Sequence, residues 1–131
     1  MSLGTRVGLA VAIALLAASA ARAHHNMSAL FDFNDRVTLN GTLAKIDWRN
    51  PHIYLAVDVK SGSEQGQSWS VEGPAPNFFR TRDINKADFE GALGKEVVVE
   101  VSRARDHSRS GLIRMLTLPG GKVVSACPQN C

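Results

Sequence analysis

Hydrophobic and polar residues alternate along much of the chain, and the first clear alternation runs from residue 36 to residue 48. A period of two is typical of a β-strand with one buried face. The phase shifts by one residue at Ala44 and Lys45, which indicates a β-bulge, and Gly41 indicates a bend in the same strand. The apolar face of this predicted strand carries Val37, Leu39, Gly41 and Leu43.

The same alternation predicts four more strands, which are bounded by turns rich in glycine, proline and small polar residues. They cover residues 52–59, 67–72, 95–102 and 112–118, and residues 122–126 are compatible with a short edge strand. The rhythm breaks between residues 75 and 91, where Pro76 suits a first helical turn and Asp83 could cap a second helical piece. The predicted inner faces of the second and third strands carry Ile53, Leu55, Val57, Val59, Trp69 and Val71.

The order of these elements, three strands, a helical insert and two strands, is that of an OB-type barrel with a long bent first strand. We therefore expect a mainly β protein, a small OB-like five-stranded barrel with a short helical insert between strands 3 and 4, preceded by a signal-peptide helix. Another small β fold with a helical insert is the alternative. The barrel domain is expected to span residues 24–122, followed by a C-terminal tail at residues 123–131.

The first 23 residues have the three parts of a secretory signal peptide. Arg6 supplies the positive charge, residues 7–18 are mostly apolar, and Ala21-Arg22-Ala23 is an A-x-A cleavage site. The apolar run is shorter than the ~20 residues that a membrane-spanning helix needs. We expect an exported protein, periplasmic or secreted, with no membrane span after cleavage. Cleavage after Ala20 is a second reading, because Ala18-Ser19-Ala20 is also an A-x-A sequence.

Cleavage changes the charge of the chain. The full sequence has 15 basic and 12 acidic residues, and removal of Arg6 and Arg22 leaves 13 against 12. A nucleic-acid-binding domain usually concentrates Lys and Arg on one face. The mature domain is nearly neutral and has few aromatic residues, so we expect no nucleic-acid partner.

Several short motifs are similar to one known family. They are His24-His25, Val37-Thr-Leu-Asn-Gly-Thr-Leu43, Ile46-Asp-Trp-Arg-Asn-Pro-His52, Trp69-Ser-Val-Glu-Gly73 and Thr117-Leu-Pro-Gly120. Together they resemble DUF6152, a family of small exported bacterial proteins of unknown function, over roughly residues 24–122. The chain departs from that family's pattern where Asn26, rather than serine, follows the histidine pair. The resemblance implies export and a β-rich fold, and it implies no mechanism.

The histidines supply the candidate metal ligands, which are His24, His25 and His52. Cleavage after Ala23 would make His24 the first residue, so that its α-amino group and a ring nitrogen could chelate one ion. A third nitrogen from His52 would complete a set suited to Cu(II), which favours tetragonal nitrogen sites. Asp47 and Asn50 could orient the His52 ring. Alternatively, His24 and His25 are an unstructured start, and His52 is a structural histidine that bonds a backbone carbonyl near Pro51.

The leading function predicted from the sequence is a small exported protein that binds copper or another transition metal without catalysis of its own. The alternative is a metal-free module that binds a small ligand or a partner through Trp48, Asn50 and Tyr54, on the barrel face around His52. An oxidative copper enzyme built on the same histidines is a third hypothesis. The chain has no nucleophile elbow and no phosphate-binding glycine loop, so no catalytic residue is predicted.

Cys127 and Cys131 lie in a Cys-Pro-Gln-Asn-Cys tail. A disulfide between them is chemically allowed in an oxidising compartment, and it would close a very small loop that adds little stability. A thiol pair that binds copper or exchanges disulfides is the functional alternative.

Overall fold

The fold is described from a computed structural model, in which residues 26–126 are described. The chain divides into two compact units, Met1–Leu30 and Phe31–Cys131. The described part of the first unit is the short helix α2 (Asn26–Leu30), and the second unit contains every described strand. The described residues contain no helix that is long and apolar enough to cross a membrane.

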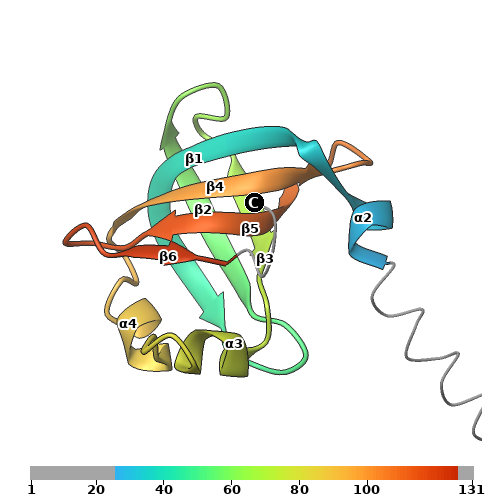
Figure 1. The fold of residues 1–131 in the computed structure, drawn as a ribbon. Coiled ribbons are helices and arrows are strands. Elements are labelled where there is room, and N and C mark those ends of the chain that lie inside the picture. The colour runs from blue at the N-terminus through green and yellow to red at the C-terminus, as the bar shows by residue number, and fades with distance from the viewer. Residues whose placement is uncertain (1–25, 127–131) are drawn as a thin grey trace, which may run out of the picture. The chain divides into compact units, whose positions relative to one another are not determined.

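The second unit is mainly β, with two short helices between its third and fourth strands, as the sequence predicts (Figure 1). Each helix is only five residues long. The elements are β1 (Phe31–Asp47), β2 (Tyr54–Ser61), β3 (Ser68–Glu72), α3 (Pro76–Arg80), α4 (Lys86–Glu90), β4 (Glu96–Ala104), β5 (Ser110–Thr117) and β6 (Val123–Ser125).

The strands form one sheet of six in the order β3-β2-β1-β4-β5-β6, with antiparallel neighbours. An additional parallel pairing joins β3 to β5, with Ser70 opposite Ser110 and Glu72 opposite Leu112. The sheet therefore has one strand more than the five predicted for the barrel, because Val123–Ser125 pairs with the end of β5. β6 falls where the sequence is compatible with a short edge strand.

β1 begins at Phe31 rather than at Arg36. Its pairing with β4 is irregular between Phe31 and Arg36, which explains why residues 31–35 show no clean period of two. Farther along, its register with β2 shifts between Asn40 and Gly41 and again between Leu43 and Lys45. Both irregularities that the sequence predicts in this strand are confirmed.

Gly41 is needed where β1 and β2 approach each other closely. A β-carbon at this position would lie 2.3 Å from the carbonyl oxygen of Asp58, well inside van der Waals contact. Because only glycine lacks a β-carbon, Gly41 allows β1 to bend at this position and to approach β2.

The core consists of the inward-facing residues of the strands together with the aromatic residues of the helical insert. Burial of each large apolar side chain contributes about 1.5–3 kcal/mol, so these residues dominate the stability of the fold. The predicted apolar faces of β1, β2 and β3 are all buried, which confirms their assignment. The largest fully buried side chains are Trp69, Phe79, Phe89, Leu39, Leu43, Ile53, Leu55, Ile113 and Leu116.

The helical insert lies at one end of the strands, near the end of β1 (Figure 1). Pro76 occupies the first turn of α3, as predicted. The cap of α4 is Asn85 rather than Asp83, and the Asn85 N–H donates to Asp88 Oδ2 at 2.7 Å. Asp83 instead has a φ of 56° and lies in the preceding turn, a conformation that aspartate tolerates better than most residues.

Candidate functional site

His52 lies immediately before β2, after a cis peptide bond between Asn50 and Pro51. Backbone pairing of β2 with β3 continues through this segment, because Gly73 N–H donates to the carbonyl of Ile53 at 2.9 Å. Ile53 is fully buried. Since successive side chains of an extended strand point to opposite faces, His52 and Tyr54 share the outer face.

On that face, Nδ1 of His52 is in contact with Oε1 of Glu72. The His52 side chain is 31% exposed and the Glu72 side chain is 14% exposed, so the carboxylate is the more deeply placed partner. With Nδ1 engaged by the carboxylate, Nε2 is the ring nitrogen that remains for a ligand. A carboxylate that fixes one ring nitrogen is the usual support for a histidine that binds a metal through the other.

Tyr54 is the third member of this cluster. It lies directly across from Glu72 in the β2–β3 register. Burial, the charge of Glu72 and a hydrogen bond to Glu72 together raise the pKa of the Tyr54 phenol. The phenol therefore stays protonated at neutral pH and donates to the carboxylate, so that Glu72 links His52 with Tyr54.

The structure changes the expected support of the His52 ring. Asp47 forms an ion pair with Arg49 instead, in which Asp47 Oδ2 lies 3.1 Å from Arg49 Nε. The Asn50 residue is exposed. Glu72 holds the ring in their place. The sequence does contain one signal for the pairing of His52 with Glu72. If β2 and β3 form a hairpin, residues at equal distances from the turn face each other, so the start of β2 lies opposite the end of β3.

Trp48, one of the predicted ligand-binding residues, packs into the aromatic part of the core. Its ring lies 5.5 Å from the ring of Phe79 and 5.1 Å from that of Phe89, measured between centroids. The ring is partly buried and lines the junction between the end of β1 and the helical insert. Tyr54 is thus the predicted ligand-binding residue that the structure places beside His52 and Glu72.

His24 and His25 lie outside the described residues, as do Cys127 and Cys131. Within residues 26–126, no group of three or more His, Cys, Asp or Glu side chains is arranged to hold a metal ion. His107, the other histidine in this range, is exposed in the turn between β4 and β5 and has a φ of 58°. Of the predicted metal ligands, His52 is therefore the one that the described residues include, and Glu72 is its partner there.

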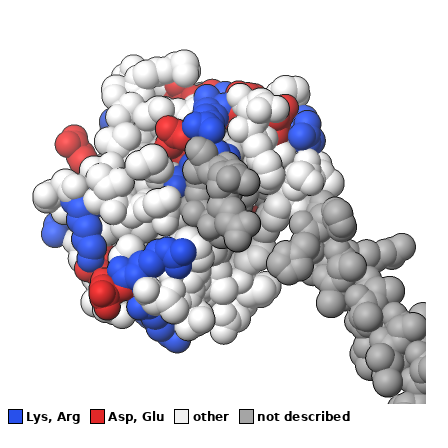
Figure 2. Space-filling view, in the orientation of Figure 1, with Lys and Arg blue, Asp and Glu red and all other residues white. Residues whose placement is uncertain are grey.

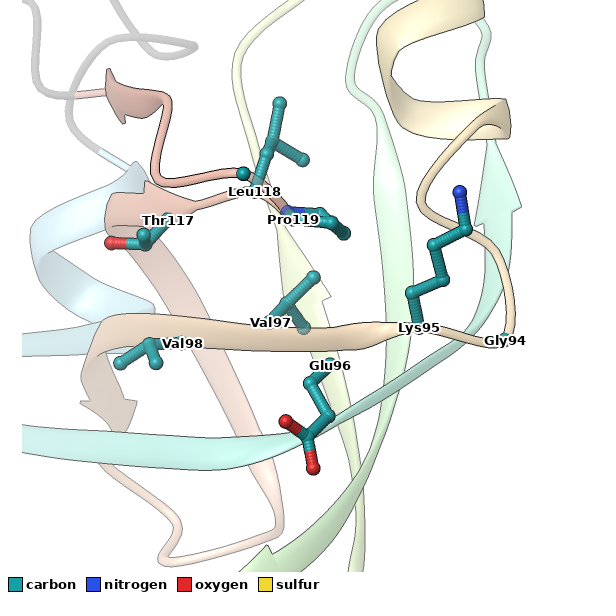
Figure 3. A pocket seen from close by; sticks show the side chains of 9 residues that line it. Gly94, Lys95, Glu96, Val97, Val98, Thr117, Leu118 and Pro119 are labelled. Carbon is teal, nitrogen blue, oxygen red and sulfur yellow. The ribbon is translucent and has the colours of Figure 1, made fainter.

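A separate hollow of about 550 Å³ lies between the start of β4 and the end of β5 (Figure 3). Val97, Leu118 and Pro119 supply its apolar lining, and Lys95 and Glu96 stand at its edge. None of His52, Tyr54 and Glu72 lines it. On the face shown in Figure 2, basic and acidic side chains are interspersed rather than gathered in one broad basic patch.

Comparison with known proteins gives one match. The model of a family of unknown function, DUF6152, matches residues 12–114. No curated protein and no solved structure matches the chain.

Proposed function

The chain belongs to the DUF6152 family, whose function is unknown, and from this premise we propose that it is a small exported binding protein with its site at His52 and Glu72. The matched family supplies no activity, so the proposal rests on the geometry of the site. The interaction that carries it is the contact between His52 Nδ1 and Glu72 Oε1, which leaves His52 Nε2 as the coordinating atom.

We also propose that the strands form an OB-like barrel. The pairings β1–β2, β2–β3, β3–β5, β5–β4 and β4–β1 connect five strands in a ring, with β6 added at the edge of β5. The helical insert between β3 and β4 is in the OB position. OB barrels bind ligands on the face of strands 2 and 3, which is where Tyr54 and Glu72 face each other.

The proposed ligand is a transition-metal ion, with copper as the leading candidate. His52 Nε2 would supply one nitrogen, and the α-amino group and ring of His24 would supply the others after cleavage behind Ala23, with His25 adjacent. Copper(II) prefers such nitrogen sets. Neutral imidazole is the form that coordinates, so binding should weaken in acid.

The test is a Cu(II) titration of the mature protein beginning at His24, followed by electron paramagnetic resonance. We expect a nitrogen-rich signal that is lost in His52→Ala and kept in His107→Ala, the matched control in an exposed turn. A methionine placed before His24 should weaken binding, because it removes the free α-amino group from that residue. Binding that is unchanged in His52→Ala would contradict the proposal.

The alternative function is a metal-free ligand- or partner-binding module that uses the same face. One observation favours it, which is that Tyr54 shares the Glu72 carboxylate. Metal that binds the folded state raises its melting temperature by mass action. Mature protein whose melting temperature and resonance spectrum do not respond to Cu(II) would favour this module over a metal carrier.

An oxidative copper enzyme is the remaining hypothesis for the same site. Copper binding without oxidase or peroxygenase turnover would favour a carrier, whereas turnover that depends on His52 would favour the enzyme. The measurement is oxidant-dependent product formation by the copper-loaded mature protein, with the His107→Ala variant as the reference.

A further inference from the structure

Arg114 is a charged residue inside a strand and is only 4% exposed. The reason is a β-bulge between β4 and β5: Val101 pairs with Ile113 and Glu100 pairs with Met115, so that no β4 residue lies opposite Arg114. A bulge redirects the side chain of the extra residue. Here it places a guanidinium beside Ser102, which is fully buried.

The guanidinium of Arg114 is under-satisfied. Its NH1 group donates to Ser102 Oγ at 3.0 Å, while its buried Nε has no hydrogen-bond partner. Arginine has five donors, and a buried charge is costly unless it is paired and hydrogen-bonded. Burial lowers the pKa of Arg114, the charge of Arg36 lowers it further, and Glu100 opposes both.

One carboxylate serves two arginines at this place. Oε1 of Glu100 lies 3.8 Å from Arg114 Nε and 3.5 Å from Arg36 NH1. Both distances exceed the ~2.7–2.9 Å of a charge-assisted hydrogen bond, so the Glu100 carboxylate forms a short hydrogen bond with neither arginine. Glu100 and Arg36 are partly exposed, at 33% and 48% of their side chains, which gives the cluster an open side.

We propose that Arg36 and Arg114 form a binding site for a small oxyanion, a carboxylate or a phosphate group, in which Glu100 is an internal occupant that the ligand displaces. Two arginines against one glutamate leave one uncompensated positive charge. A carboxylate or phosphate has two oxygens that can accept from both guanidinium groups at once. The Ser102 hydroxyl, which accepts from Arg114, holds the plane of that guanidinium. The site is independent of His52.

The test titrates the full mature protein with inorganic phosphate and, in parallel, with acetate, and isothermal titration calorimetry measures the affinity of every variant. The Arg114 Nε–H resonance locates the bound probe in the proteins that keep Arg114. Glu100→Gln removes the competing charge while keeping the size of the side chain, and it should bind about tenfold more tightly than the wild type. Arg36→Gln and Arg114→Met should each weaken binding at least about tenfold. Arg109→Gln, in the exposed turn before β5, is the control and should have little effect.

Binding of both probes supports a general oxyanion site, and binding of one alone supports the same site and identifies its preferred group. If Glu100→Gln gains no affinity and phosphate leaves the Arg114 resonance unmoved, the proposal is overturned. Binding that survives Arg36→Gln also overturns it. Should Arg114→Met fail to fold, Arg114→Lys keeps the charge without the planar fork, and unchanged affinity in that variant would contradict the proposed geometry.

Discussion

Tyr54 and Glu72 face each other directly across β2 and β3, and the same carboxylate contacts the ring of His52. The largely buried carboxylate thus accepts a hydrogen bond from the Tyr54 phenol and contacts the His52 imidazole. Because the Glu72 carboxylate interacts with both His52 and Tyr54, a substitution at Glu72 should alter the properties of both side chains. This makes Glu72 the residue through which the cluster can be tested without removing either predicted ligand-binding side chain.

The titration of Tyr54 gives a direct measurement of that relationship. Tyr54 is the only tyrosine of the chain, so the phenolate absorbance near 295 nm reports it alone. We expect it to titrate above its ordinary value of 10.0 in the folded protein and to move back toward that value in Glu72→Gln. Because the folded pKa is raised, the associated stability is present below about pH 10 and is lost as pH rises through the folded pKa. A wild-type midpoint at or below 10.0 would contradict the geometry.

Replacement of Glu72 by alanine should destabilise the fold by about 1–3 kcal/mol, because it leaves the partly buried Tyr54 hydroxyl without its acceptor. The measurement is urea unfolding of the two proteins. Glu90→Ala is the matched control, since Glu90 forms an exposed ion pair with Lys86 at 3.0 Å within α4. That pair should contribute about 0.3–0.5 kcal/mol. Equal losses in the two variants would show that Glu72 has no special role.

Gly41→Ala should be among the most damaging single-atom additions to the protein. The added β-carbon would lie 2.3 Å from the Asp58 carbonyl oxygen, so β1 and β2 would have to separate. Such overpacking typically costs about 1–3 kcal/mol. Gly91→Ala is the control, because Gly91 has a φ of −65°, which alanine adopts readily. The nearest atom to a β-carbon added there is the Ala87 carbonyl oxygen, at 3.2 Å. Urea unfolding of both variants tests the difference, and a near-neutral Gly41→Ala would refute it.

Glu64 should make the stability of the protein depend on acid pH. Arg103 NH2 lies 3.0 Å from Glu64 Oε1, and Trp69 Nε1 donates to Oε2 at 3.3 Å. The hydrogen bond from Arg103 is the main reason that the pKa of Glu64 falls below its ordinary 4.5. A lowered folded pKa gives stability that is present above the ordinary value and is lost as pH falls through the folded pKa.

Glu64→Gln should therefore lose about 1–2 kcal/mol at neutral pH, and the difference from wild type should shrink as the pH falls below about 4. Tryptophan fluorescence during urea unfolding at several pH values measures this. A difference that stays constant across that range would mean that the charge of Glu64 contributes nothing.

If residues 1–23 are a cleaved leader, as we propose, the position of cleavage decides whether His24 has a free α-amino group. We expect the exported protein to begin at His24, with cleavage behind Ala23. Intact mass and amino-terminal sequencing of the protein from the culture medium or periplasm would show this. A start at Ala21 would place His24 inside the chain and remove its α-amino group from the proposed copper site.

The strand positions could be predicted from the sequence because burial of one face imposes a period of two. Val37, Leu39 and Leu43 in β1 show this clearly. The bulge at Ala44 and Lys45 could be predicted for the same reason, since an extra residue inverts the phase of the pattern. The irregularity at Gly41 was indicated by the glycine itself. The insert between β3 and β4 could be predicted from the loss of that pattern together with Pro76, although the cap of α4 is Asn85 and not Asp83.

The sequence by itself thus determined the element order and the buried faces, and it singled out His52 as a candidate ligand. Only the tertiary structure decided that Glu72, rather than Asp47, meets His52, and that Arg114 is buried beside Ser102. The physical reason is that periodicity fixes which face a residue occupies, but not which residue lies opposite it. That second property depends on the register between paired strands, and one bulge is enough to change it.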